Sequence, residues 1–143
     1  MKKLAIFFVI IIIIVVGVAY LVIDYQNKQN KIKKENQFFE SYIGKEISGT
    51  ELATIINKAT DNNFKNEVEL DEKNNYINND NNSIKIDIKM LDNDRTYSME
   101  TIYNNKIQNF VSYYGIITFK CTKVEYHEST GKIKYMLFEQ ITK

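Results

Sequence analysis

The chain has 143 residues, enough for one modest domain, and its 19 Lys and Arg residues nearly balance its 18 Asp and Glu residues. A near-neutral chain lacks the clustered positive charge that binds a phosphate backbone, which argues against a nucleic-acid-binding protein. The single cysteine, Cys121, excludes an intrachain disulfide and a zinc site built from several thiolates. The bias toward Asn, Ile and Lys, without Pro or Trp, is typical of a bacterium with an AT-rich genome.

The N-terminus carries an apolar run from Leu4 to Ile23 that contains no charged residue. As an α-helix, these roughly 20 residues reach about 30 Å, which is the thickness of the hydrocarbon core of a bilayer. Most of them are Leu, Ile, Val or Phe, and each such residue favours insertion by about 0.3 to 0.6 kcal/mol. We therefore predict that Leu4 to Ile23 contacts the lipid bilayer as a transmembrane helix, within a membrane segment covering residues 1–25.

The same run permits two fates, a retained signal-anchor or a cleaved signal peptide. Gly17 and Ala19 provide the small-x-small pattern of a cleavage site, so cleavage after Ala19 stays open. However, the apolar run continues from Tyr20 to Ile23, where a cleaved signal normally turns polar. This continuation favours the retained anchor.

The charges that flank the span bear on its orientation. Lys2 and Lys3 precede the span and several lysines follow it within residues 28–34, so the positive-inside rule gives nearly balanced flanks. A short N-terminal flank before a leading apolar segment is handled as a signal-anchor, which leaves the N-terminus inside. We expect a single-pass protein of the cell membrane with an extracytoplasmic C-terminal domain.

Residues 26–45 are polar but rich in helix formers, and we predict a polar helical stalk that ends at Gly44. A separate domain over residues 46–143 then begins with a helix. Ser48 is its expected N-cap and Glu51 the partner in a capping box. Apolar residues at helical spacing follow up to Ala59, and the pair Asn62 and Asn63 suits the end of the helix.

The hydrophobic period then changes from 3.6 to 2. In "SIKIDIKM" the residues Ile84, Ile86, Ile88 and Met90 share one face, which predicts a half-buried antiparallel strand. The stretch "LDNDR", with Asp92, Asn93 and Asp94, supplies turn residues. The following "TYSMETIY" is expected to be the partner strand, with Tyr97, Met99 and Tyr103 on one face.

The C-terminal third predicts a short helix and a second hairpin. Apolar residues recur at helical spacing from Ile107 to Tyr114, and Gly115 closes this segment. Two alternating segments then flank a turn at residues 128–131. Short edge strands at 68–70 and 76–77 flank an Asn-rich loop. The expected fold class is α+β: an N-terminal transmembrane helix, then a small domain with an antiparallel sheet and two to three helices.

No cluster of ionisable residues predicts a catalytic, cofactor-binding or metal site. Cys121 and His127 lie about 20 Å apart along one predicted strand, too far for a shared metal or a nucleophile and base. Glu125 and His127 are neighbours on that face and are expected to be a solvated pair.

Two loops carry weak motif matches. Asn78, Asp80 and Asn82 imitate the start of a calcium loop, but Ser83 and Lys89 replace the glycine and glutamate that such a loop requires. The stretch from Ser129 to Lys132 matches Ser-x-x-Lys but coincides with a hairpin turn. We predict polar loops at these places and at residues 92–94.

Tyrosines are the remaining candidates for function. Those in or near the predicted sheet either pack across strands or form an exposed face for a protein partner. They are Tyr97, Tyr103, Tyr113, Tyr114, Tyr126 and Tyr135. The expected function is a non-enzymatic binding or structural module at the cell surface, whose biological process and oligomeric state the sequence leaves open. A membrane-tethered enzyme is an alternative from another class.

The order of an apolar helix, a polar helix and an α+β head resembles the layout of type IV pilin-like subunits. That resemblance implies assembly through the N-terminal helix. The chain departs from the pilin pattern because its first glycine is Gly17, inside the apolar run, and because Leu4 to Ile23 contains no glutamate.

Overall fold

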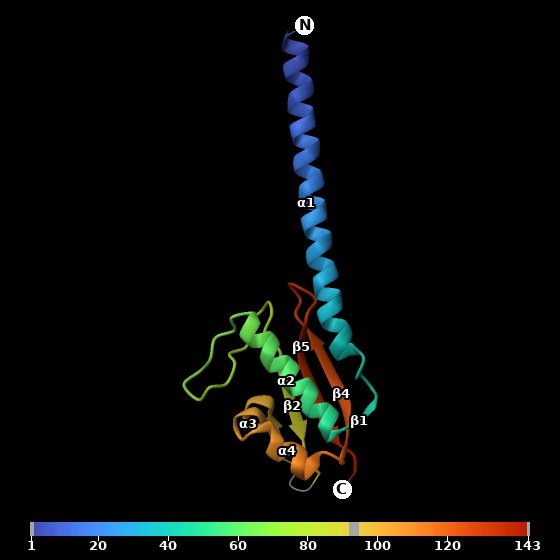
Figure 1. Ribbon diagram of the computed structural model, residues 1–143, viewed down its shortest axis with the longest axis vertical. Coiled ribbons are helices and arrows are strands. Elements are labelled where there is room, and N and C mark those ends of the chain that lie inside the picture. Colours follow the sequence, from blue (N-terminus) through green and yellow to red (C-terminus); the bar gives the residue numbers. More distant parts are fainter. Residues whose placement is uncertain (1, 92–94, 143) are drawn as a thin grey trace. The chain divides into compact units, whose positions relative to one another are not determined.

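The computed structural model describes residues 2–91 and 95–142 and has the predicted α+β architecture (Figure 1). Its elements are α1 (Lys2–Glu40), β1 (Glu46–Ser48), α2 (Gly49–Lys65), β2 (Lys85–Lys89), β3 (Thr96–Ser98), α3 (Met99–Asn104), α4 (Ile107–Tyr114), β4 (Thr118–Tyr126) and β5 (Ile133–Gln140). The turn expected at Asp92, Asn93 and Asp94 lies outside the described residues.

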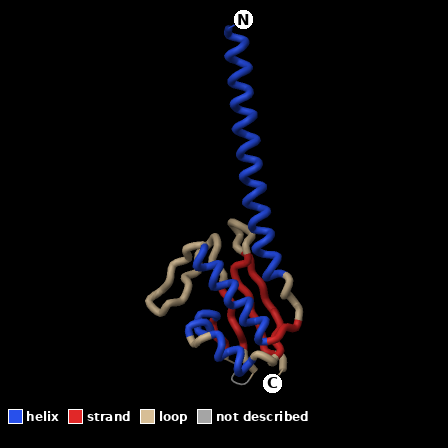
Figure 2. Tube along the Cα trace, viewed as in Figure 1, coloured by secondary structure: helices blue, strands red, loops and turns tan. Residues whose placement is uncertain are grey.

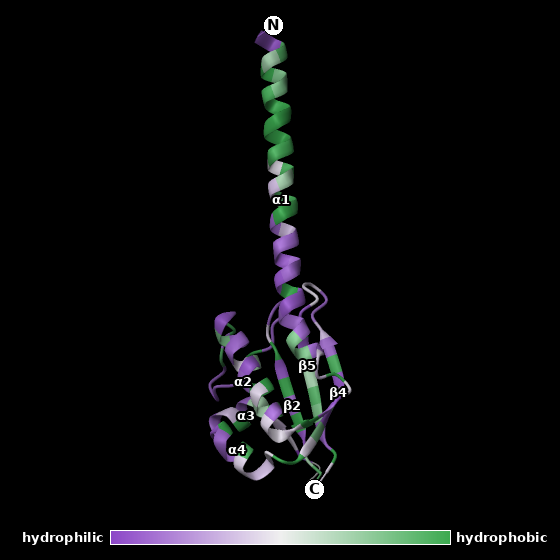
Figure 3. Ribbon diagram, turned by 45° about the vertical axis from the view of Figure 1, so that its right-hand side comes forward, coloured by the Kyte–Doolittle hydropathy of each residue, from purple (hydrophilic) through white to green (hydrophobic). Residues whose placement is uncertain are grey.

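The chain divides into two compact units, residues 1–34 and residues 35–143. In the first unit, the apolar side chains of α1 form a continuous stretch that gives way to a polar stretch (Figure 3). Among the described residues, α1 is the one helix long and apolar enough to cross a membrane, and none of its apolar stretch is buried within the protein. Exposure of so many apolar side chains to water would be unfavourable in free energy. The helix therefore fits the assignment as a membrane-spanning segment.

The strands of the second unit, drawn red in Figure 2, form one sheet. It has five strands in the order β1-β4-β5-β2-β3. The predicted strand at residues 84–90 is confirmed as β2, and it pairs antiparallel with β3. The expectation of a purely antiparallel sheet needs correction, because β5 pairs parallel with the other edge of β2. Local alternation reveals a strand but carries no information on its second, distant neighbour.

Helices α2, α3 and α4 lie on one face of the sheet (Figures 1 and 3). The capping box is confirmed: Ser48 Oγ accepts a hydrogen bond from the Glu51 backbone N–H, and Glu51 Oε2 accepts one from the Ser48 N–H at 2.8 Å. The apolar stripe of α2 is fully buried, as are the alternate side chains Ile86 and Ile88 of β2. The apolar stripe of α2, which has the helical period, and the alternate residues of β2, which have the strand period, thus both contribute to the core.

The long partner strand expected at residues 96–103 is wrong beyond Ser98. Strand β3 ends there, and the Ser98 side chain accepts a hydrogen bond from the Thr101 N–H, capping α3. A serine in the extended conformation satisfies a free N–H at a helix start, and this favours a helix over a continued strand. Met99 is completely buried within α3, and Tyr103 is half exposed.

The last residues of α1 belong to the second unit. Phe39 is buried in its core. The Asn36 amide donates to the carbonyl of Gly131 at 2.8 Å and accepts from the Ile133 N–H at 3.0 Å, and Glu35 forms a 2.8 Å ion pair with Lys132. Residues 35–40 are thus bound to the β4–β5 hairpin by side chains as well as by the chain itself.

The Asn-rich loop before β2 is ordered by its own side chains. The Asn79 side-chain oxygen accepts hydrogen bonds from the N–H groups of residues 81, 82 and 83. The edge strands expected in this loop are reduced to one isolated bridge between Leu70 and Tyr76. Hydrogen bonds from Ser129 and Thr130 to the loop backbone fix it against the β4–β5 turn.

Candidate binding site

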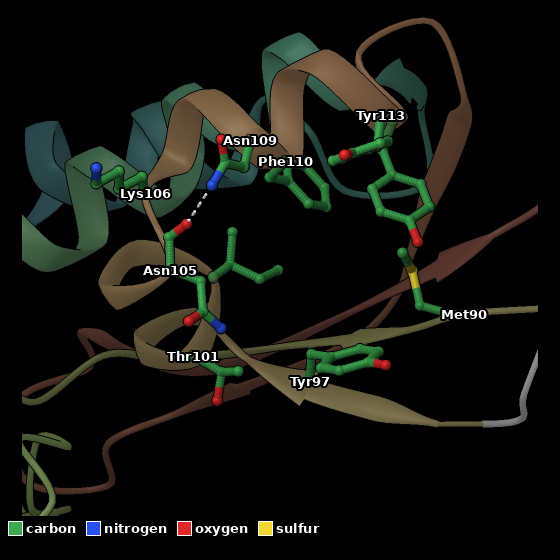
Figure 4. A pocket seen from close by; sticks show the side chains of 10 residues that line it. Met90, Tyr97, Thr101, Asn105, Lys106, Asn109, Phe110 and Tyr113 are labelled. Atoms are coloured by element: carbon green, nitrogen blue, oxygen red, sulfur yellow. Dashed lines mark hydrogen bonds between the residues drawn. The ribbon is translucent and has the colours of Figure 1, made fainter.

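A pocket of about 220 Å³ opens between α3, α4 and the ends of β2 and β3 (Figure 4). We call it the tyrosine pocket, because three tyrosines line it together with apolar and amide side chains. Its lining residues are Met90, Tyr97, Thr101, Ile102, Asn105, Lys106, Asn109, Phe110, Tyr113 and Tyr114. Its volume is below the range of about 300 to 1,000 Å³ found for drug-sized ligands, so it suits one or two side chains of a larger partner.

Two glycines place α4 beside the start of α2. The Gly49 N–H donates to the carbonyl of Ile117 at 2.9 Å. A Cβ added to Gly49 would lie 1.8 Å from the carbonyl oxygen of Tyr114, and one added to Gly115 would lie 2.4 Å from that of Val111. Only glycine permits such close approach of backbone to backbone, so these residues fix the C-terminal end of α4 and with it one wall of the pocket.

The floor of the pocket is apolar and rigid. Met90, Ile102 and Phe110 are all more than nine-tenths buried. The Phe110 ring packs against the rings of Tyr114 and Phe119, with centroids 5.4 Å and 6.0 Å away. Aromatic contacts at these distances stabilise a fixed arrangement, so the floor offers a preformed apolar surface.

The rim of the pocket is polar. The Asn109 amide nitrogen donates to the backbone carbonyl of Asn105 at 2.9 Å (Figure 4). No described residue donates to the Asn109 side-chain oxygen, so this oxygen can accept from a ligand. Among the described residues of the lining, Lys106 carries the one charged side chain, and it has a positive φ of 67° at the start of α4. A rim of amides and one ammonium around an apolar floor matches the anatomy of protein-binding pockets.

Exposed apolar side chains follow closely in the chain after elements that line the tyrosine pocket or pair beside them. Ile116 is 94% exposed and Tyr113 is 78% exposed. Leu91 and Ile141, which follow the parallel strands β2 and β5, are also exposed. Single exposed apolar residues are ordinary on a protein surface, but several of them close to one pocket indicate an interaction surface.

The structure separates the six tyrosines singled out from the sequence. Tyr97, Tyr113 and Tyr114 line the tyrosine pocket, where Tyr113 is exposed and the other two are partly buried against the core. Tyr126 donates to Glu40 at 3.2 Å and Tyr135 donates to Asp87 at 3.2 Å, so these two have structural partners. The remaining one, Tyr103, lines a different pocket. The amides and Lys106 on the pocket rim could not be found from the sequence, because their grouping depends on the packing of α3 against α4.

The side chains considered above as candidates for a catalytic or metal site have structural roles. Cys121 is buried, and this burial raises the pKa of its thiol, which disfavours the nucleophilic thiolate. His127 is also buried, and its Nε2 lies 2.7 Å from the carbonyl oxygen of Ser83. The expected Glu125–His127 pair is not formed. Instead, Glu125 forms an ion pair with Lys123 at 2.6 Å.

The two loop motifs are likewise accounted for by packing. Ser129 donates to a backbone carbonyl of the Asn-rich loop, and Lys132 is paired with Glu35. Within residues 2–91 and 95–142, no three His, Cys, Asp or Glu side chains lie close enough to hold a metal ion.

Comparison of the chain with protein-family models, with curated proteins and with solved structures gives no match. The resemblance to pilin-like subunits therefore stays a prediction from the order of elements alone.

Proposed function

We propose that this protein is a single-pass membrane-anchored binding module, without catalytic activity, whose domain faces the outside of the cell. The observation that carries the proposal is the tyrosine pocket with its surrounding apolar side chains, on a chain whose first helix can span a bilayer. A tethered domain of this kind recognises its partner at the membrane surface.

A partner polypeptide suits this site better than a small metabolite. The pocket is small, and the exposed side chains of Ile116 and Tyr113 extend the apolar surface beyond it. Tyrosine is enriched where protein interfaces carry most of their binding energy, since its ring buries a large area at little entropic cost. The expected ligand feature is one large apolar or aromatic side chain inserted among Met90, Phe110 and Tyr97, with backbone groups on the amide rim.

The outward orientation is supported by the signal-anchor character of the N-terminus. Protease added to intact cells is expected to digest residues 35–143 while leaving the membrane segment. Protection of this domain in intact cells, followed by digestion after lysis, would show that the domain faces the cytoplasm and would contradict the proposed orientation.

Site-specific photocrosslinking tests the binding face. Benzoylphenylalanine placed at position 113 in the full chain, in the cells that make it, is expected to give adducts of discrete mass. The same group at position 64 is the control, because Phe64 is an aromatic residue with 75% exposure that lies outside the tyrosine pocket.

The adducts from position 113 should be lost when Ile116→Asp is added, since a charge there disrupts an apolar contact while the side chain has no core role. Equal adducts from positions 113 and 64, or adducts that survive Ile116→Asp, would contradict the proposed face.

A further inference from the structure

A second pocket, on the opposite side of α3, differs in chemistry from the tyrosine pocket. We call it the acidic pocket, because Glu100 is the one charged residue in its lining, within a cavity of about 220 Å³. Polar and aromatic side chains from α2, α3 and the loop before β2 surround this carboxylate: Thr60, Asn74, Tyr76, Tyr103 and Asn104.

Glu100 is buried without compensation from the protein. Its side chain is only 6% exposed, and no hydrogen bond or ion pair joins it to another residue that the structure describes. Burial of a carboxylate is unfavourable unless a positive charge or hydrogen-bond donors replace the lost water. The Glu100 carboxylate therefore has no hydrogen-bond donor or cation beside it among the described residues, and its oxygens stay accessible at the pocket.

Thr60 gives a second, independent sign of a missing ligand. This residue is about nine-tenths buried and lines the acidic pocket, and its hydroxyl oxygen has no hydrogen-bond partner among the described residues. Buried polar side-chain atoms are satisfied in the large majority of cases, so the wall of the acidic pocket contains an unpaired hydroxyl next to a carboxylate without a protein partner.

Two tyrosines complete the surroundings. The Tyr76 hydroxyl lies 3.4 Å from the carbonyl oxygen of Thr60. Tyr76, Tyr103 and Glu100 line the same cavity. Burial raises the pKa of Tyr76, and interaction with the ionisable groups of Tyr103 and Glu100 raises it further. Aromatic rings next to a carboxylate attract organic cations, since the ring faces carry negative potential.

We propose that the acidic pocket binds a primary alkylammonium group, such as the end of a lysine side chain or a small amine. The ammonium would pair with the Glu100 carboxylate and donate to an amide oxygen of Asn74 or Asn104. Its alkyl chain would contact the rings of Tyr76 and Tyr103. A single carboxylate cannot assemble the coordination shell of a divalent metal, and this favours an organic monovalent cation. The proposal does not depend on the function proposed for the tyrosine pocket.

The test uses the full chain in detergent micelles with ring-labelled tyrosine, observed by NMR. Propylammonium chloride is expected to shift the signals of Tyr76 and Tyr103 in a saturable way while leaving that of Tyr135 in place. The uncharged analogue 1-propanol should produce no saturable shift at the same concentrations. Sodium chloride is the control for ionic strength.

Glu100→Gln is expected to weaken propylammonium binding at least tenfold, because it removes the charge while keeping the size of the side chain. Glu69→Gln is the matched control, since Glu69 is exposed in the nearby loop and outside the acidic pocket. Tyr103→Leu, at a half-exposed position, is a second variant that weakens binding without removing a buried group.

Isolated charge pairs bind weakly in water, so the titration extends to about 50 mM propylammonium. Absence of a saturable shift over this range would overturn the proposal. Equal shifts from sodium ions, or unchanged affinity in folded Glu100→Gln, would overturn it as well.

Discussion

Replacement of Asn63 by alanine is expected to destabilise the domain strongly. Asn63 is fully buried near the end of α2, and its amide forms two hydrogen bonds with the backbone of Ile84, just before β2. It donates to the Ile84 carbonyl and accepts from the Ile84 N–H, each at 2.8 Å. One side chain thus satisfies both backbone groups of a residue that is itself buried.

The magnitude follows from those two groups. A buried backbone group that loses its partner costs about 1 to 3 kcal/mol, so Asn63→Ala should lower the free energy of unfolding by about 3 kcal/mol. With a urea dependence of about 1.5 kcal/mol per molar, the unfolding midpoint should fall by about 2 M. This is a large part of the 5 to 15 kcal/mol that a domain possesses.

Urea unfolding of the full chain in detergent micelles, followed by tyrosine fluorescence, measures the change. All tyrosines except Tyr20 and Tyr25 lie in residues 35–143, so the signal reports on this unit. Asn62→Ala is the control, because Asn62 is only partly buried and its side chain forms no hydrogen bond with the residues that the structure describes. The reasoning fails if Asn63→Ala costs less than 1 kcal/mol or no more than Asn62→Ala.

Further predictions concern α2 and the outer face of the sheet. Gly49→Ala should cost more than 2 kcal/mol, since its Cβ would clash with the Tyr114 carbonyl; thermal unfolding measures this, and Gly17→Ala, which meets no atom within 4 Å, should have no effect. Ser48→Ala removes the acceptor for the Glu51 N–H and should cost about 1 kcal/mol in the same assay, whereas an unchanged midpoint would mean that the cap is dispensable. Burial, the charge of Asp87 and a hydrogen bond to it raise the pKa of Tyr135 to about 12. The folded chain therefore holds this proton more tightly than the unfolded chain, and Tyr135 should contribute stability that is present below pH 10 and is lost as pH rises from 10 to 12. Because the side chain is partly exposed, screening limits this contribution to about 1 kcal/mol. Tyr135→Phe should flatten that part of the stability curve, and identical curves for the two proteins would refute the coupling to Asp87.

Elements with local signals could be predicted from the sequence. The capping box of Ser48 and Glu51 starts α2 where expected, and the alternation around Ile86 and Ile88 gives β2. Both patterns depend on neighbours within a few residues. By contrast, β3 was expected to continue past Ser98, because the apolar and aromatic residues that follow fit a strand as well as a short helix.

Features that depend on distant contacts could not be predicted. The parallel pairing of β2 with β5 joins segments nearly 50 residues apart. Asn63 was expected only to end a helix, and nothing in its neighbours shows that its amide reaches Ile84. Glu100 belonged to a predicted strand. Its burial in the acidic pocket could not be predicted, because it depends on α3 and on the residues of α2 that line the same pocket.

The candidate site was predicted in part. Tyr97, Tyr113 and Tyr114 were singled out as members of a possible exposed face, and the fold brings them together. Tyr126 and Tyr135 were singled out for the same reason, but they form hydrogen bonds elsewhere on the domain. Composition therefore singles out tyrosine as a residue type, while the packing of α3 and α4 decides which tyrosines line the pocket.

The central claim is that residues 4–23 remain on the chain and hold it in a membrane. Intact mass measurement of the chain, after alkaline carbonate extraction of the cells that make it, tests this claim most directly. The account predicts a chain in the membrane pellet whose mass includes the whole apolar run. A soluble chain that begins at Tyr20 would contradict it.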